Sequence, residues 1–304
     1  MATRSRTRAR ALQDELIAAL ESRSAARVEK VLDNPLSNLT ADQVLESAVL
    51  LCRGRWTQRE KTLFAMLFAR GATPAVGAVI LCTCAPLPGH AVPVLRGLFE
   101  LAAMDVEELC AYGPAGKDEA NGMLHICAAE GGEDVMEELL RERNGRAPDV
   151  NSKDSYGRTP LLFAVTRGRA KMVQLLLRQK GVDVNVRSKH GLAAIDVAVQ
   201  VNTECHEIVE LLAKAGAQLD RPSPQSAYYP LHCACINNYV RSADALLRHG
   251  ATADVLVEDD DLFHGMTPLH LAAQVGVELV KTLVSRGANV DKQDRRNNNV
   301  NLLI

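Results

Sequence analysis

Aromatic residues are scarce in this chain of 304 residues, and neither sign of charge is in excess. Phe, Trp and Tyr make up 4% of the sequence, with a single Trp, Trp56. A core with so few aromatics must be built from Leu, Val and Ala, which favours closely packed helices over a β-sandwich or barrel. The net charge of −2 lacks the basic excess that a bulk nucleic-acid binder needs, so nucleic acid is not expected as a partner.

Long hydrophobic runs are also missing. The longest candidate, residues 76–84, is far shorter than the roughly 20 residues that a membrane-spanning helix requires, so no membrane span is predicted. No apolar stretch follows the basic first residues, which argues against a secretory signal. The eight cysteines are therefore interpreted as reduced thiols of a cytoplasmic protein, with a nuclear location as the alternative.

Motifs for catalysis and metal binding are absent as well. The sequence has no Gly-x-Ser-x-Gly, phosphate-binding loop, dinucleotide-binding glycine pattern or His-Glu-x-x-His. The Cys-x-Cys pairs, Cys82/Cys84 and Cys233/Cys235, have no matching second half that would complete a zinc site. We therefore expect no enzyme activity, no catalytic residues, no metal, no cofactor and no small-molecule substrate.

The second half of the chain does contain a repeat. Its clearest copy runs Gly265-Met-Thr-Pro-Leu-His-Leu-Ala272, and an apolar residue recurs in the position of Leu269. The five copies of that residue are Leu124, Leu161, Ile195, Leu231 and Leu269, at steps of 37, 34, 36 and 38 residues. Each copy is followed by a Leu-rich helix that runs into a glycine: Gly145, Gly181, Gly216, Gly250 and Gly287. Glycine at this place is typical of a helix that ends in the left-handed conformation.

These landmarks resemble the ankyrin repeat, whose signature is Thr-Pro-Leu-His-x-Ala on a period of about 33 residues. The resemblance covers residues 117–294. It implies an all-α ankyrin-repeat solenoid of helix-turn-helix units with short β-hairpin loops. Departures from the signature, such as Tyr229 in the place of Thr and Asp196 in the place of His, indicate diverged natural repeats.

The rest of the chain is assigned by extension. Residues 1–10 carry Arg at every second position from Arg4 and are expected to form a basic, disordered tail, with a nuclear import signal or a basic arm for acidic surfaces as alternatives. Residues 11–116 are expected to hold diverged helical repeats that cap the array, since Gly71 lies two 37-residue periods before Gly145. A separate small helical bundle is the alternative there. Residues 295–304 open a further, incomplete repeat.

The family resemblance implies a protein–protein interaction module: an adaptor, a scaffold or a subunit of a larger assembly. Its partner would bind the concave surface of hairpin tips and first helices, through contact positions transferred by their phase in the repeat. The predicted partner-binding residues are Tyr156, Arg158, Arg167, Lys189, His190, Tyr228, Asn237, Phe263, His264, Met266 and Gln274. The alternative for the aromatic members is local packing between neighbouring loops.

Three further expectations come from the repeat. His125, His232 and His270 are expected to bond neighbouring loop backbone and order the stack. Asn185, in Leu-x₅-Asp-Val-Asn, fits a pattern resembling sites of asparagine hydroxylation on ankyrin repeats. The break within the last hairpin suggests, as an alternative function, the regulatory repeat array of a larger protein whose catalytic or channel domain lies beyond residue 304.

Overall fold

The computed structural model describes residues 14–34, 39–51, 57–72, 91–102, 122–130, 132–142, 147–201, 204–224, 226–257 and 265–294. The described residues are helices joined by turns, with no strand among them, so the predicted all-α class is confirmed. The chain divides into two compact units, residues 1–149 and 150–304, each described here by itself. The basic tail, Trp56, Phe263, His264 and residues 295–304 lie outside the described residues.

The first unit contains six helices with assigned bounds. These are α2 (Ala25–Leu32), α3 (Ala41–Leu51), α4 (Gln58–Ala69), α6 (Ala91–Ala102), α8 (Met123–Glu130) and α9 (Glu133–Leu140). Helix α4 packs on α2, α3 and α6, and α9 packs on α6 and α8. Fully buried side chains such as Phe64, Leu95 and Met123 fill the spaces between them. Arg96 of α6 bonds buried Glu138 of α9 at 2.7 Å, which pairs two helices that are distant in sequence.

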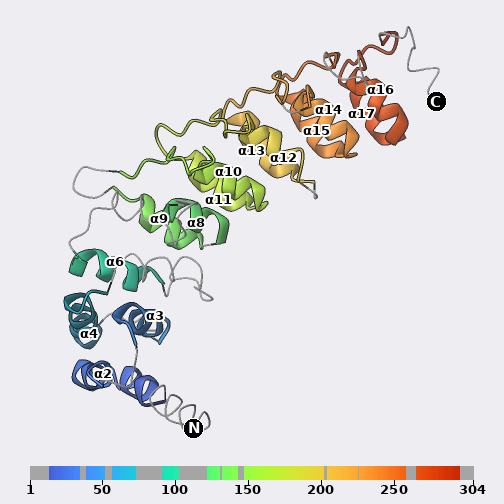
Figure 1. Ribbon diagram of the computed structural model, residues 1–304. Coiled ribbons are helices and arrows are strands. Elements are labelled where there is room, and N and C mark those ends of the chain that lie inside the picture. Colours follow the sequence, from blue (N-terminus) through green and yellow to red (C-terminus); the bar gives the residue numbers. More distant parts are fainter. Residues whose placement is uncertain are drawn as a thin grey trace. The chain divides into compact units, whose positions relative to one another are not determined.

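The second unit repeats one motif four times, a pair of antiparallel helices followed by an extended loop (Figure 1). The first helices are α10 (Pro160–Thr166), α12 (Ala194–Ala198), α14 (Pro230–Ile236) and α16 (Pro268–Val275). The second helices are α11 (Ala170–Leu177), α13 (His206–Lys214), α15 (Val240–Arg248) and α17 (Val277–Ser285). Helices α11, α13, α15 and α17 pack successively on one another, and α10 packs on α12 as α14 does on α16.

The core between the two helix rows is aliphatic, as the composition predicts. Leu161, Leu176, Ile195, Leu246 and Leu283 are each at most 2% exposed. Burial of a Leu or Ile side chain stabilises by about 1.5–3 kcal/mol, so each helix pair gains most of its stability from contact with its neighbours.

Each second helix of this unit is followed by a glycine in the left-handed conformation, as predicted from the sequence; Gly145, the other predicted glycine, lies outside the described residues. After α11, Gly181 has φ +77°. Gly216 has φ +87°, and Gly250 and Gly287 both have φ +94°. After α15, the Ala251 N–H donates to the Leu246 carbonyl at 3.0 Å, which satisfies a carbonyl that the helix leaves open. The chain then leaves the helix row and enters the next loop.

The hairpin tips of the second unit use the same conformation, with one exception. Gly157, Gly191 and Gly265 have φ between +72° and +77°, but the third hairpin has Ala227, with φ +55°. A Cβ atom makes this conformation unfavourable by about 1 kcal/mol. The third hairpin therefore carries backbone strain that the other three lack.

Candidate interaction face

Neighbouring hairpin tips of the second unit lie directly against one another. The Lys189 N–H donates to the Tyr156 carbonyl at 2.8 Å, and Gly191 of the same tip approaches Pro224 of the next loop. A Cβ atom on Gly157 would lie 3.1 Å from the Lys189 nitrogen, so glycine also permits this close approach. The side chains of Tyr156, Lys189 and His190, three predicted partner-binding residues, are exposed at these tips.

Arg158 is held in place by the buried Asp154. The Asp154 carboxylate accepts bonds from the Tyr156 N–H at 2.9 Å, the Arg158 N–H at 2.7 Å and the Arg158 Nε at 2.7 Å. The guanidinium lies 4.9 Å from the ring centroid of Tyr156 and 4.5 Å from that of Phe163. Tyr156, 39% exposed, is thus fixed against a cation before any partner arrives.

The first helices continue this surface toward their C-terminal ends. Phe163, Thr166 and Arg167 stand three and four residues apart on one side of α10, so they form a stripe that begins under Arg158. The equivalent exposed residues are Gln200 after α12, Ile236 and Asn237 at the end of α14, and Gln274 and Val275 at the end of α16. We define the hairpin face as segments 152–169, 186–201, 221–239 and 265–277.

Three of the predicted residues are also engaged in packing, Asn237 and Met266 with a neighbouring repeat and Tyr228 within its own. The Asn237 amide donates to the Val199 carbonyl at 2.9 Å, and the ring of half-buried Tyr228 lies 6.3 Å from that of His232. Met266 is half-buried, and its carbonyl accepts from His232. Packing within the array therefore uses part of Tyr228, Asn237 and Met266, whereas Lys189 and His190 project from the tips.

The structure also exposes apolar residues that the prediction does not include. Ile236 is 40% exposed, Val275 41% and Val277 67%. Ile236 and Val275 adjoin the predicted Asn237 and Gln274, so their phase in the repeat could have identified them. Val277 begins α17 directly after Gly276, and a Cβ atom added to Gly276 would lie 3.5 Å from the Asn238 side chain. These three residues expose aliphatic surface at the ends of α14 and α16 and at the start of α17.

His232 has the role in ordering the stack that the sequence predicts. The Tyr229 N–H lies 3.4 Å from its Nδ1, and its Nε2 lies 3.2 Å from the Met266 carbonyl of the next repeat. The ring is completely buried, and burial lowers its pKa to about 4 against the opposing effect of its bonds to backbone. A neutral imidazole that accepts at Nδ1 and donates at Nε2 satisfies both contacts.

Side-chain hydrogen bonds join the loops that follow successive second helices. The Asn185 amide donates to the Gly216 carbonyl at 3.2 Å and accepts from the Gln218 N–H at 2.8 Å. Asn151, Asp220 and Asp254 repeat this contact, each accepting from a backbone N–H of the following repeat at 2.8–2.9 Å. We call Asn151, Asn185, Asp220 and Asp254 the loop ladder. Asn185, the predicted hydroxylation site, therefore also bonds one repeat to the next.

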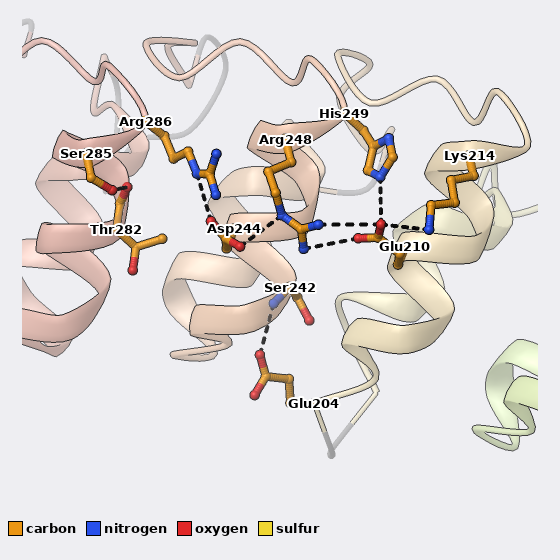
Figure 2. Close-up of polar contacts among 10 residues, drawn as sticks. All are labelled: Glu204, Glu210, Lys214, Ser242, Asp244, Arg248, His249, Thr282, Ser285 and Arg286. Carbon is orange, nitrogen blue, oxygen red and sulfur yellow. Dashed lines mark hydrogen bonds and ion pairs between the residues drawn. The ribbon is translucent and has the colours of Figure 1, made fainter.

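Charges on the second helices are paired with one another (Figure 2). Glu210 of α13 lies 3.0 Å from Lys214, 3.1 Å from Arg248 and 3.0 Å from His249. Hydrogen bonds from His249 and Lys214 lower the pKa of Glu210 to about 2. Asp244 of α15 bonds Arg248 at 3.0 Å and Arg286 at 2.8 Å, so the network links three successive repeats.

The cysteines of the second unit are placed for packing. Cys233 and Cys235 are buried in α14, and burial raises the pKa of Cys233 to about 12 and that of Cys235 further. Among the described residues, no group of three or more His, Cys, Asp or Glu side chains could hold a metal ion. Within the same part of the chain, no helix is long and apolar enough to cross a bilayer.

Comparison with known proteins gives a consistent result. A family model described as "Ankyrin repeats (3 copies)" matches residues 124–223 and 197–294, together more than half of the chain. Rabankyrin-5 of Mus musculus is 30% identical over 172 residues, which cover 56% of this chain and 14% of that protein. The B-cell lymphoma 3 protein homolog of Mus musculus is 36% identical over 140 residues, 45% of this chain and 30% of that protein.

The solved structures extend this similarity. The crystal structure of the ankyrin repeat domain of Bcl-3, a member of the IkappaB protein family, superposes with a TM-score of 0.59 at 26% identity. The match covers 77% of this chain and 94% of the Bcl-3 chain. The sequence match spans less than a third of either relative's full length.

Proposed function

Because the chain belongs to the ankyrin repeat family, we propose that it is a non-catalytic adaptor or scaffold that holds a protein partner on its hairpin face. Ankyrin repeats mediate protein–protein interaction, and that general function holds for this chain. The adaptor or scaffold role, the face and its residues are our proposal. A location in the cytoplasm or nucleus accompanies it.

The fixed geometry of the hairpin tips is the observation that carries the proposal. Tyr156 is exposed, yet its backbone is bonded to Asp154 and Lys189, and its ring is held beside Arg158. Tyr and Arg are enriched among the residues that dominate interface energies. A surface that is already ordered loses little conformational entropy on binding, so more of the contact energy remains as affinity.

The test is affinity capture from the native cell with the tagged chain, followed by quantitative mass spectrometry. The variant Y156A/K189A/I236S removes exposed groups from the hairpin face, and V284S/V290S removes two exposed valines from α17 and the loop after it as the matched control. We expect the first variant to lose at least one partner more than tenfold, with equal circular dichroism, and the control to keep it. Retention of every partner by the folded hairpin-face variant would refute the proposed face.

A second candidate function is the regulatory array of a longer protein. It is supported by the lengths of the relatives, since the matched stretch is only 14% of Rabankyrin-5. Full-length transcript sequencing tests it, because a stop codon directly after the codon for Ile304 would exclude a following domain. The structural match over 77% of the chain also supports our proposal that residues 11–116 include diverged repeats.

A further inference from the structure

The hairpin face has a charge distribution of its own. All seven of its Lys and Arg residues lie in segments 152–169, 186–201 and 221–239, beside two carboxylates, which gives these three segments a net charge of +5 in a chain whose total is −2. The sequence between Val257 and Gly265 of the fourth hairpin instead contains Glu258-Asp-Asp-Asp261, which lies outside the described residues. The two carboxylates are Asp154, 6% exposed and bonded to Arg158, and Asp196, 2% exposed. Asp196 accepts from the Ala193 N–H at 2.8 Å and lies 3.4 Å from Arg187. The described residues of these three segments therefore present no exposed carboxylate to a partner.

The exposed cations of this face occupy adjacent loops. Lys153 precedes the first hairpin tip, Lys189 and His190 form the second tip, and Arg221 begins the third loop, all with exposed side chains. The bond from Lys189 to the Tyr156 carbonyl and the approach of Gly191 to Pro224 bring these three loops together. Like charges on neighbouring loops raise the local positive potential and favour an anionic partner.

Several other carboxylates of the second unit lie on the second helices and in the loops after them. Glu210 and Asp244 are bound within the network of Figure 2, and Asp220 and Asp254 belong to the loop ladder. These four carboxylates are thus already bonded within the repeat array.

The other half of the hairpin face is aliphatic. Segments 221–239 and 265–277 contain Arg221 as their only charged residue, and they expose Ile236, Val275 and Val277. Helix α14 packs on α16, and Gly276 lies near Asn238, so the ends of the two helices that carry these residues are neighbours. Exposed branched aliphatic side chains can pack against an apolar protein segment, but they offer no hydrogen bond or charge to a phosphate backbone.

We propose that the hairpin face binds an acidic protein segment, with Asp and Glu side chains on its basic half at residues 152–201 and apolar side chains on its aliphatic half. The inference rests on the proposed function and names the chemistry of the partner. Charge complementarity favours carboxylates near Lys153, Lys189 and Arg221, and Ile236 with Val277 fixes the direction of the bound segment.

Two charge-reversed variants of the whole chain test the basic half. K153E/K189E/R221E changes the hairpin face, and K171E/R178E/K180E makes the same charge change at exposed positions of α11 and the turn after it. Each protein, with folding checked by circular dichroism, selects from a displayed library of random dodecapeptides. We expect pools selected on the wild type and on the second variant to hold Asp and Glu at twice the input frequency or more, and the pool from K153E/K189E/R221E to show no such excess.

The best wild-type peptide is then measured by fluorescence anisotropy. Its Kd should rise at least tenfold for K153E/K189E/R221E, at least threefold for I236S/V277S and less than twofold for K171E/R178E/K180E. A wild-type pool without excess Asp and Glu, failure to select any peptide, or equal binding of the hairpin-face variant overturns the inference. Oligo(dT) of twelve nucleotides that binds as tightly as the peptide overturns it in favour of a general polyanion surface.

These outcomes are separable from failure of the proposed function. A partner lost by Y156A/K189A/I236S in the capture experiment, together with a non-acidic peptide pool, leaves the interaction face standing and overturns only its preference for acidic segments. Retention of every partner by that variant overturns the face itself.

Discussion

Burial of His232 should make the repeat array sensitive to mild acid. The folded protein holds this ring neutral with a pKa of about 4, whereas the unfolded chain binds a proton near the ordinary value of 6.5. The unfolded state therefore takes up a proton first as the pH falls. Stability from this group is complete above pH 6.5 and is lost as the pH approaches 4.

The size of the effect follows from the two pKa values. Each pH unit over which only the unfolded state is protonated costs about 1.4 kcal/mol. Between pH 7 and pH 5 the loss assigned to His232 is about 2 kcal/mol. Glu210, with its pKa lowered to about 2, retains its charge throughout this range and does not contribute.

Urea unfolding at pH 7 and pH 5, followed by far-ultraviolet circular dichroism, measures this loss. H232Q keeps a side-chain donor that can reach the Met266 carbonyl but cannot take up a proton, so its free energy of unfolding should fall by about 2 kcal/mol less than that of the wild type. H190Q removes an exposed histidine from a hairpin tip and should keep the wild-type pH dependence. Equal pH dependence of H232Q and the wild type would refute the reasoning.

Three further changes probe the backbone, the loop ladder and the paired charges. A227G should raise the free energy of unfolding by about 0.5–1 kcal/mol because glycine relieves the strain at φ +55°, whereas A234G inside α14 should lower it; urea midpoints compare the two. N185A should cost about 1–2 kcal/mol in the same assay, because it removes two bonds to the next repeat. E210Q should reduce the loss of stability between pH 4.5 and pH 2 in acid titration, since the carboxylate is stabilised in the folded state and the amide does not titrate; an unchanged acid limb would show that the charge network does not act through Glu210.

Sequence periodicity was sufficient to identify the helix pairs of the second unit because similar residues begin and end the helices of successive pairs. Pro160 and Pro268 begin their helices, and Thr159 and Thr267 accept bonds from the first turn. The packing role of His232 was predictable for the same reason. Partner-binding residues beyond the described part, Phe263 and His264, remain predictions.

The site was less predictable than the fold, since exposure depends on neighbours that periodicity does not show. Tyr156 lies directly before the hairpin-tip residue Gly157 and Tyr228 directly after the tip residue Ala227, yet Tyr228 packs near His232 and Tyr156 is exposed beside Arg158. The sequence also did not show that Asp154 and Asp196 are paired with arginines, because both look like ordinary loop and helix carboxylates. The structure shows both carboxylates buried and paired with arginines, so the exposed charge of segments 152–201 is positive.

The loop ladder has a direction that matters while the chain is being synthesised. In every rung a side chain of the earlier repeat accepts from backbone of the later one: Asn151 binds Asp183, Asn185 binds Gln218, and Asp220 binds Thr252. A ribosome releases the side chain of each rung some 32 to 35 residues before the backbone that it binds. A finished repeat thus offers the emerging one a template that is already in position, and vectorial folding from the N-terminal side is built into the order of these contacts.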